Sequence, residues 1–511
     1  MGLKEKIAHE KHLLAYPETP HGPLGMIYPN VYGVGMACLG FQQIYRLFQE
    51  SGIAAERIFF DKKGRETRSL NNQIPLFRFP YLATSYTYEL DIIHLLQMMI
   101  RGGVEPLWQD RSEGSPILIV GGQASTANVR VVSRIADIIV IGEGERVVST
   151  LAQTLIEAQG LPRMDVLTRV AERVPNVFVP AVHEVYDPTV HTAHSMDEID
   201  EVDCHSIMLA PDDEFGGAFL LEVSRGCMYR CKFCIVHYMN GSARYRNYDK
   251  LIGVLERYQN DYHKVGLLGA AVADHPQVEE ITEWLLTRGK QVSTSSLRAE
   301  RITERFLDLL KAAGQHNITV APETGSIESR KRMRKGVKDE KYIRLAEWAG
   351  KRRFPSMKLY FVIGTPESEP MQEASDIIEF GKKMNDAFTK SGGGRLTITV
   401  SPFVPKPTTP WADGGLWEPK VVKKASRIIR KELAFRNNVR VPPVNVKEAR
   451  AETVLSWSGA ELTDELLRLA HGELSLENAF KDFDFASLDR NAETSALPHA
   501  STLKYLAKAR G

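Results

Sequence analysis

Hydrophobic and polar positions alternate along the chain in two series of strand-like and helix-like segments. The first series runs from about Met26 to Gly160, and each apolar run is followed by a turn of small residues and an amphipathic stretch. The strand-like segments are MIYPNVYG, AERIFFD, YLATSYTY, PILIVGG and ADIIVIG, and the helix-like ones are FQQIYRLFQESG, ELDIIHLLQMMIRGG and ERVVSTLAQTLIEAQG. This alternation predicts a parallel sheet covered by helices, an α/β domain of the Rossmann-like, flavodoxin-like kind over residues 1–160.

A second series begins near residue 217 and contains six strand and helix units. Its strand-like segments are AFLLEVS, HKVGLLGAA, QVSTSSL, NITVAPE, MKLYFVIG and LTITVSPF. Eight units would close a full barrel, so six predict either a doubly wound sheet or a partial, open barrel over residues 217–410.

Two further regions lack this alternation. Residues 161–216 mix acids, turn formers and histidines without an apolar face, and we interpret them as a linker. Residues 411–511 contain a basic helix, PKVVKKASRIIRKELAFRNN, and further helical stretches, and we expect a mainly helical C-terminal domain. An apolar stripe on the basic helix favours packing against the body of the protein over binding of an acidic partner.

Length, charge and composition restrict the class of protein. The chain has 511 residues, 65 Lys and Arg against 64 Asp and Glu, and 43% hydrophobic residues. About three compact domains are expected from this length, and the near-zero net charge argues against a general attraction to nucleic acid. The start of the chain lacks the apolar core of a secretory signal, and no apolar run is long enough to span a membrane, so we expect a cytoplasmic protein with neither membrane nor nucleic-acid partners.

Glycine-bearing turns follow several strands of the first series, in the segments 33–40, 121–125 and 142–145. Folds of this kind usually bind a ligand at the carboxyl ends of the strands. Alternatively, these glycines serve only to make tight turns.

The sharpest chemical feature is SRGCMYRCKFC, which places Cys227, Cys231 and Cys234 in a C-x3-C-x2-C spacing directly after the first strand of the second series. Structural zinc usually takes four ligands in two pairs, and this sequence offers no second pair. Three cysteines instead suit an iron–sulfur cluster with one open iron. The alternative is zinc with His237 as a fourth ligand. The other two cysteines of the chain are Cys38 and Cys204, and we interpret Cys204 as structural.

This cysteine run, with Phe233 before its last cysteine, resembles the signature of radical S-adenosylmethionine (SAM) enzymes, and the resemblance extends over the second series. It implies a partial barrel of six units whose three cysteines hold a 4Fe-4S cluster, with the amino and carboxylate groups of SAM on the fourth iron. The implied SAM-binding positions are Phe233, Gly269, Ser296, Arg298, Glu323 and Gly364. The second strand, which carries Gly269 as the position implied for the amino group, departs from the family pattern in lacking a plain G-G-E triplet.

The first series resembles the cobalamin-binding domain that precedes the barrel in one branch of this superfamily. The resemblance implies cobalamin contacts at Gly35, Met36, Cys38, Gly40, Ser85, Tyr86, Gly121, Gly122, Gln123, Gly142 and Gly144. The D-x-H-x-x-G element, whose histidine often ligates cobalt from below, is absent from residues 1–160. Cys38 either faces cobalt or is a buried apolar residue.

The resemblance implies an enzyme that cleaves SAM reductively to a 5′-deoxyadenosyl radical and uses cobalamin to methylate an unactivated carbon. Its partners would be an external low-potential electron donor and an unidentified substrate such as a peptide or protein side chain. One alternative is a cobalamin-independent radical SAM enzyme with a vestigial first domain. Another is a nonenzymatic iron–sulfur or zinc protein.

Overall fold

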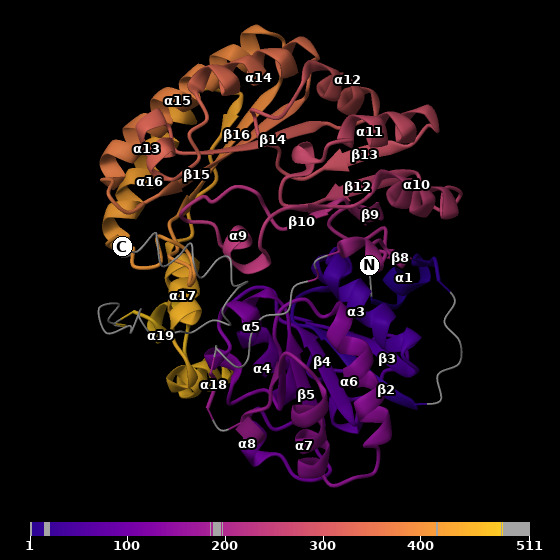
Figure 1. The fold of residues 1–511 in the computed structure, drawn as a ribbon. Helices are drawn as coiled ribbons and strands as arrows, with labels where there is room; N and C mark the ends of the chain where they lie inside the picture. The colour runs from indigo at the N-terminus through magenta and orange to yellow at the C-terminus, as the bar shows by residue number, and fades with distance from the viewer. Residues whose placement is uncertain are drawn as a thin grey trace. The chain divides into compact units, whose positions relative to one another are not determined.

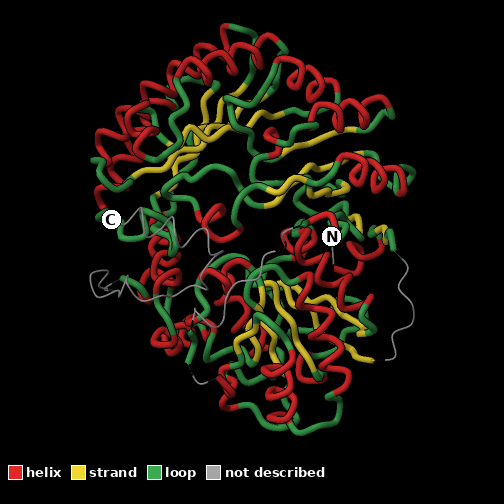
Figure 2. The backbone as a smooth tube through the Cα atoms, viewed as in Figure 1, coloured by secondary structure: helices red, strands yellow, loops and turns green. Residues whose placement is uncertain are grey.

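The computed structural model describes residues 3–14, 21–183, 185–187, 196, 198–414, 417–481 and 483. The chain forms two compact units. Unit 1 comprises Met1–Ala218 and Ala451–Gly511, and unit 2 comprises Phe219–Arg450. Figure 1 follows the chain by colour, and Figure 2 separates its helices from its strands.

Unit 1 is built on a six-stranded sheet in the order β3-β2-β4-β5-β6-β7. Its strands are β2 (His21–Tyr28), β3 (Ile53–Phe59), β4 (Tyr81–Ser85), β5 (Ile117–Gly121), β6 (Ile138–Val140) and β7 (Val177–Phe178). All neighbours pair in parallel except β6 and β7. Counted from β2, the five parallel strands follow the order 2-1-3-4-5, which is the flavodoxin-like order. The fold expected for the first series is therefore confirmed.

Helices cover both faces of this sheet. They are α2 (Tyr32–Met36), α3 (Leu39–Glu50), α4 (Asp91–Arg101), α5 (Gln123–Ala127), α6 (Glu145–Glu157), α7 (Arg163–Arg173), α8 (Pro180–His183), α18 (Thr463–His471) and α19 (Leu476–Ala479). Helix α1 (Leu3–Ala8) and a two-stranded pair of β1 (Lys11–His12) with β8 (Met208–Leu209) complete the unit.

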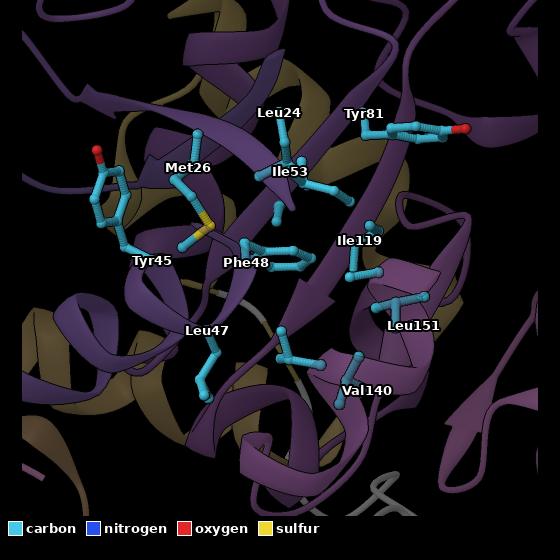
Figure 3. Close-up of a cluster of buried hydrophobic side chains, with 14 of the residues drawn as sticks. Leu24, Met26, Tyr45, Leu47, Phe48, Ile53, Tyr81, Ile119, Val140 and Leu151 are labelled. Carbon is cyan, nitrogen blue, oxygen red and sulfur yellow. The ribbon is translucent and has the colours of Figure 1, made fainter. Parts of the chain in front are cut away.

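The sheet is buried between two apolar clusters, one of which is drawn in Figure 3. That cluster joins Met26 and Ile119 on the strands to Phe48 on α3 and Leu151 on α6, all at most 3% exposed. Burying one such side chain stabilises a fold by about 1.5–3 kcal/mol. Strands that are buried on both faces read as continuous apolar runs, which is why the segments of the first series lack a polar face.

A buried ion pair ties the N-terminal segment to this sheet. Arg57, on β3, donates from Nη1 to Glu10 Oε1 (2.6 Å) and from Nη2 to Glu10 Oε2 (2.7 Å), and both side chains are at most 1% exposed. Tyr32 also donates to Glu10 Oε1 (2.6 Å). Burial by itself would raise the pKa of Glu10, but the hydrogen bonds from His12, Arg57 and Tyr32 and the charge of Arg57 lower that pKa to about 2.

Unit 2 is an open, curved sheet of parallel strands with helices on its outer face (Figure 1). Strands β9 (Phe219–Glu222), β12 (Lys264–Leu268) and β13 (Gln291–Thr294) form one part in the order β13-β12-β9. Strands β14 (Asn317–Glu323), β15 (Ser356–Ile363), β16 (Arg395–Pro402) and β17 (Val439–Arg440) form the other. A parallel bridge between Leu297 and Val320 joins the two parts. The six expected strands thus follow one another as a partial barrel.

The helices of unit 2 are α9 (Ile235–Asn240), α10 (Tyr248–Arg257), α11 (Val278–Thr287), α12 (Glu304–Ala312), α13 (Ile327–Arg332), α14 (Asp339–Lys351), α15 (Pro370–Lys390) and α16 (Pro419–Leu433). A short antiparallel pair, β10 (Ser224–Arg225) with β11 (Arg244–Tyr245), follows β9. Alternate positions of β15 are buried, and Phe361 on that strand contacts Phe380 of α15 edge to face (6.3 Å between ring centroids). The apolar face of the sheet therefore lies under the helices.

Two of the expected domain boundaries are wrong. Residues 161–216 are not a linker but part of unit 1, because α7 packs with the apolar cluster of that unit and β7 extends its sheet. Residues 411–511 are not a separate helical domain. The buried stripe of α16, with Val422, Ile429 and Leu433, packs on the barrel, and β17 adds a strand to it. The chain passes to unit 1 within α17 (Val446–Trp457), and α18 buries Leu466 in the second apolar cluster of that unit.

None of the helices in the described part of the chain is both long and apolar enough to cross a membrane.

We expect Glu10→Gln to lower the free energy of unfolding of unit 1 by about 3 kcal/mol, because the charge of Arg57 would stay buried without its partner. Guanidinium unfolding at pH 7 measures this loss. The folded-state pKa of Glu10 lies below the ordinary value of 4.5, so the advantage of the wild type is complete above that value and disappears as the pH falls toward about 2.

Glu157→Gln is the matched control, because Glu157 pairs with Arg173 at the surface, where both side chains are at least 39% exposed. A loss at Glu10→Gln no larger than that of the control would contradict the account of this ion pair.

Candidate functional site

The three cysteines lie on the loop between β10 and α9, close to the carboxyl end of the first barrel strand. The loop begins at Gly226, whose φ of 72° is left-handed, and a Cβ there would lie 2.4 Å from the carbonyl oxygen of Ser242. It ends at Cys234, the residue before α9. The backbone N–H of Cys227 donates to the oxygen of Gly241 (3.2 Å), which closes the loop. The turn therefore requires glycine at position 226.

Backbone and aromatic contacts hold the loop against the barrel. The N–H of Lys232 donates to Met333 O (3.0 Å), and the N–H of Trp411 donates to Lys232 O (3.1 Å). Phe233, the aromatic residue singled out in the sequence, packs against a small apolar cluster of Met333, Phe403 and Trp411. The side chain of Phe233 thus fixes the position of the loop.

Burial raises the pKa of all three thiols, to about 11 for Cys234. The positive charges of Lys335 and Arg298 act in the opposite direction on Cys231. Thiols in this environment are protonated at neutral pH, and binding to iron would displace their protons. The donor set, three cysteines on one loop, fits an iron–sulfur cluster.

The zinc alternative has less support. His237 lies 2.6 Å from the backbone oxygen of Cys227 through its Nδ1 atom, and burial lowers its pKa. Across the described ranges, no group of three or more His, Cys, Asp or Glu side chains is arranged to hold a single metal ion. The irons of a cluster are separate atoms, so its cysteines do not have to meet at one point.

Charged residues at the carboxyl ends of the next strands surround this loop. Glu323 ends β14 at a break in the register with β15, has a φ of 66°, and accepts a hydrogen bond from Lys335 Nζ (2.7 Å). Arg298, after β13, places its guanidinium 3.4 Å from the ring centroid of Tyr229, a residue of the cysteine loop. Arg298 and Glu323, two of the positions implied for SAM, therefore lie near the cysteines.

Three residues of this network were missed in the sequence analysis, namely Asp274, Glu300 and Arg301. Tyr229 donates from its hydroxyl to Asp274 Oδ1 (2.8 Å), and Arg301 Nε lies 2.7 Å from the same oxygen. Arg298 Nε donates to Glu300 Oε1 (2.7 Å). The available signal was their position, because charged residues just after barrel strands lie at the end of the barrel where active sites form.

Five buried polar atoms at this end of the barrel have no hydrogen-bond partner within the described residues. They follow β12, β13, β14 and β16, and they are Asp274 Oδ2, Glu300 Oε2, Thr324 Oγ1, Thr408 Oγ1 and Trp411 Nε1. An unpaired buried polar atom costs about 1–3 kcal/mol. The amino, carboxylate, hydroxyl and adenine groups of SAM would supply donors and acceptors to such atoms, so the residues present fit this ligand.

The remaining SAM positions lie at the same edge. Gly269 follows β12, and a Cβ there would lie 2.4 Å from Ser224 Oγ. Ser296 is exposed after β13. Gly364 follows β15, and its N–H donates to the buried carboxylate of Glu373 (2.5 Å). A Cβ on Gly364 would lie 2.6 Å from Trp417, so packing of Trp417 already accounts for this glycine.

Gly364 and Trp417 also line a small pocket with a volume of about 20 Å³, which is close to the room that one water molecule needs. Phe403, Val422 and Val446 add apolar surface to it, and Arg450 adds a charge.

The residues implied for cobalamin lie where β2, β4, β5 and β6 of unit 1 end. This is the edge where doubly wound sheets bind ligands. Gly40 and Gln123 are exposed, and Cys38, Gly121, Gly142 and Gly144 are partly exposed. A Cβ added to Gly40 would have no atom within 4 Å, so a ligand could approach the backbone of this residue closely.

Other members of this set support the fold. Met36 and Tyr86 are fully buried in the two apolar clusters, and Ser85 is buried at the end of β4. A Cβ on Gly35 would meet the ring of Phe59, one on Gly122 would meet the backbone of Tyr86, and one on Gly144 would meet Ile44. For these three glycines, internal packing explains the absence of a side chain.

Cys38 is only partly exposed, at the residue before α3. Burial raises the pKa of its thiol. This environment is that of a small apolar residue, the second of the two interpretations made from the sequence. Cys204 is buried and is not one of the residues of the cysteine loop.

Two sequence-family models match the chain, one in each unit. Residues 40–180 match the sequence family described as radical SAM proteins, N-terminal, and residues 221–381 match the radical SAM superfamily. The uncharacterized protein MJ0966 of Methanocaldococcus jannaschii is 23% identical over 467 residues, which cover 90% of this chain and 93% of that protein.

Among solved structures, the chain is similar to the radical SAM methyltransferase TsrM from Kitasatospora setae. The structure of TsrM with bound cobalamin and a 4Fe-4S cluster matches with a TM-score of 0.56 and 13% identity, over 89% of this chain and 100% of that one. A second TsrM structure, with tryptophan substrate and the SAM analogue aza-SAM, matches with a TM-score of 0.55 and 11% identity, over 96% and 99% of the two chains. At these identities the likeness establishes the fold.

We expect Gly226→Ala to prevent assembly of the iron–sulfur cluster, because the added Cβ collides with the oxygen of Ser242 and the left-handed φ is strained. After anaerobic reconstitution, iron should fall from about four per chain to less than about one. Gly253→Ala is the control, since Gly253 lies within α10 with open space around it. Iron binding by Gly226→Ala equal to that of the control would refute the requirement for glycine.

Proposed function

Because this chain belongs to the radical SAM superfamily, we propose that it is a cobalamin-dependent radical SAM methyltransferase that acts on an unactivated carbon. The observation that carries the proposal is the cysteine loop at the carboxyl edge of a partial barrel, in a chain whose N-terminal unit has a flavodoxin-like sheet. A fold shared with TsrM over nearly the whole chain supports the methyltransferase part.

The cluster and SAM would together supply the 5′-deoxyadenosyl radical, which abstracts hydrogen from carbon that side-chain bases cannot deprotonate. Cys227, Cys231 and Cys234 would hold the cluster, and an external low-potential donor would provide the electron. Phe233 keeps the loop packed on the barrel, and the pair of Glu323 and Lys335 keeps charge balanced beside it. These residues bind and orient the reacting groups.

Cobalamin would lie at the carboxyl edge of the unit 1 sheet, against the exposed turn at Gly40 and the partly exposed turns at Gly121 and Gly142. The turn after β2 carries no histidine in the D-x-H-x-x-G spacing. When bound at this edge, cobalamin would supply the methyl-transfer chemistry, and the turns would position it.

A peptide or protein side chain is one candidate for the substrate, because α16 presents Lys423, Lys424 and Arg427 as exposed residues on the face opposite its buried stripe. Such a basic face would suit an acidic protein surface.

A second candidate function is radical SAM chemistry without cobalamin. It is favoured by the packing at the unit 1 edge, where Gly35, Gly122 and Gly144 are explained by internal contacts and where Met36 and Tyr86 are buried. In that case the first unit would have a structural or substrate-binding role.

Iron and cobalt counts separate these functions. We expect protein reconstituted with iron, sulfide and hydroxocobalamin to retain about four irons and one cobalt per chain after desalting. The triple variant with Cys227, Cys231 and Cys234 replaced by Ala should lose the iron alone. Elemental analysis by mass spectrometry provides both counts.

Four irons without cobalt would favour the cobalamin-independent function. Zinc, or no metal at all, would overturn both candidate functions.

A further inference from the structure

We propose that Asp274 and Glu300 bind SAM directly, Asp274 through the ammonium group and Glu300 through a ribose hydroxyl. The inference rests on the proposed function, since it assumes that SAM binds beside the cysteine loop. Neither residue belongs to the set that the family resemblance implies, and each has one buried carboxylate oxygen with no partner among the described residues.

Asp274 ends a short 3₁₀ turn, Val272–Asp274, after β12, and its side chain is only 1% exposed. Its Oδ1 atom is fully engaged, since it accepts from Tyr229 and lies 2.7 Å from Arg301 Nε. Its Oδ2 atom is buried and has no partner among the described residues. Asp274 Oδ2 therefore lacks a hydrogen-bond donor, and a positively charged donor would form the strongest hydrogen bond to it.

Glu300 shows the same division between its two oxygens. Arg298 donates to Oε1 from Nε (2.7 Å) and also approaches it through Nη2, while Oε2 is buried without a partner in the described part of the chain. The side chain of Glu300 is 24% exposed, so it lies nearer to solvent than that of Asp274. Ser296, one of the positions implied for SAM, also follows β13 and is exposed.

Tyr229 connects both carboxylates to the cysteine loop. Its hydroxyl contacts Asp274, and its ring lies under the guanidinium of Arg298, the partner of Glu300. Because Tyr229 stands between Cys227 and Cys231 in the sequence, both unpaired oxygens belong to the surroundings of the cluster site.

The chemistry of SAM matches these two acceptors. Its ammonium group is a cation with several N–H donors, and its ribose offers neutral O–H donors. The side chain of Asp274 is the more deeply buried of the two, at 1% exposed, so its unpaired oxygen gains most from a cationic donor. We therefore assign the ammonium group to Asp274 and the neutral ribose hydroxyl to the less buried Glu300.

Binding of three ligands to reconstituted protein tests the assignment. SAM and S-adenosylhomocysteine carry both the ammonium group and the ribose, whereas 5′-methylthioadenosine carries the ribose alone. Asp274→Asn keeps an acceptor for Tyr229 and Arg301 but places an N–H₂ group where Oδ2 stood. Glu300→Gln makes the same change at Glu300. Isothermal titration under anaerobic conditions measures each dissociation constant.

We expect Asp274→Asn to weaken binding of SAM and S-adenosylhomocysteine by about 10- to 100-fold, the effect of a lost hydrogen bond to a charged group. Binding of 5′-methylthioadenosine should change by less than about twofold. Glu300→Gln should weaken all three ligands by a similar factor of about 3 to 10. Glu279→Gln is the matched control, because Glu279 pairs with Arg305 of α12 near the surface. The side chain of Arg305 is 54% exposed.

For each variant, we divide the dissociation constant of 5′-methylthioadenosine by that of S-adenosylhomocysteine. This ratio does not depend on the fraction of protein that carries the cluster. Asp274→Glu, which keeps the charge, should keep this ratio above that of Asp274→Asn. An unchanged ratio in Asp274→Asn would overturn the ammonium contact, and unchanged binding in Glu300→Gln would overturn the ribose contact. Wild-type protein that binds neither SAM nor S-adenosylhomocysteine would overturn the proposed function together with the inference.

Discussion

The direction of the strands is the constraint on which both candidate sites depend. In a parallel sheet all carboxyl ends meet at one edge, and each strand must return through a helix that covers a face. Unit 1 obeys this rule with five parallel strands, and unit 2 obeys it with a partial barrel. Residues far apart in the sequence, such as Cys231, Arg298 and Glu323, are brought together because each follows a strand.

Buried carboxylates of the two units differ in how their oxygens are satisfied. In unit 1, Arg57 contacts both oxygens of Glu10, so this buried carboxylate is fully paired within the chain. At the barrel edge, Asp274 and Glu300 each use one oxygen and leave the other unpaired among the residues that the structure describes. Folding bears this cost of about 1–3 kcal/mol per atom, and a ligand with matching donors would recover it.

In the cysteine loop, burial disfavours the charged form of the thiols. It raises the pKa of all three cysteines, so they are protonated at neutral pH, and a bound metal cation would replace their protons. The positive side chains of Lys335 and Arg298 partly offset burial at Cys231. The conformation of this loop depends on Gly226, whose backbone only glycine adopts without strain.

Apolar periodicity was enough to predict the longer parallel strands of both units, because buried parallel strands form continuous apolar runs. It was not enough for the domain boundaries. The stretch 161–216 contains short elements, such as β7, whose stability comes from tertiary pairing. Helix α18 returns to unit 1 from the far end of the chain, and no local pattern encodes that contact.

The candidate site was predictable only in part, because some of its residues belong to motifs that are local in the sequence and others do not. The cysteines and Arg298 belong to recognisable motifs, whereas the roles of Asp274 and Lys335 follow from partners that lie distant in the sequence, Tyr229 and Glu323. Glycines gave an ambiguous signal, since Gly122 is required by the backbone of Tyr86 while Gly40 has open space around it. Only the three-dimensional contacts distinguish a glycine needed for packing from one that admits a ligand.

Electron paramagnetic resonance of the reduced, reconstituted protein tests the central claim most directly. The claim is that the cysteine loop holds a 4Fe-4S cluster whose open iron binds SAM. We predict that dithionite produces the signal of a reduced 4Fe-4S cluster and that added SAM changes its g values, because a new ligand joins one iron. A reduced signal that stays the same with saturating SAM, or the absence of any cluster signal, would contradict the account.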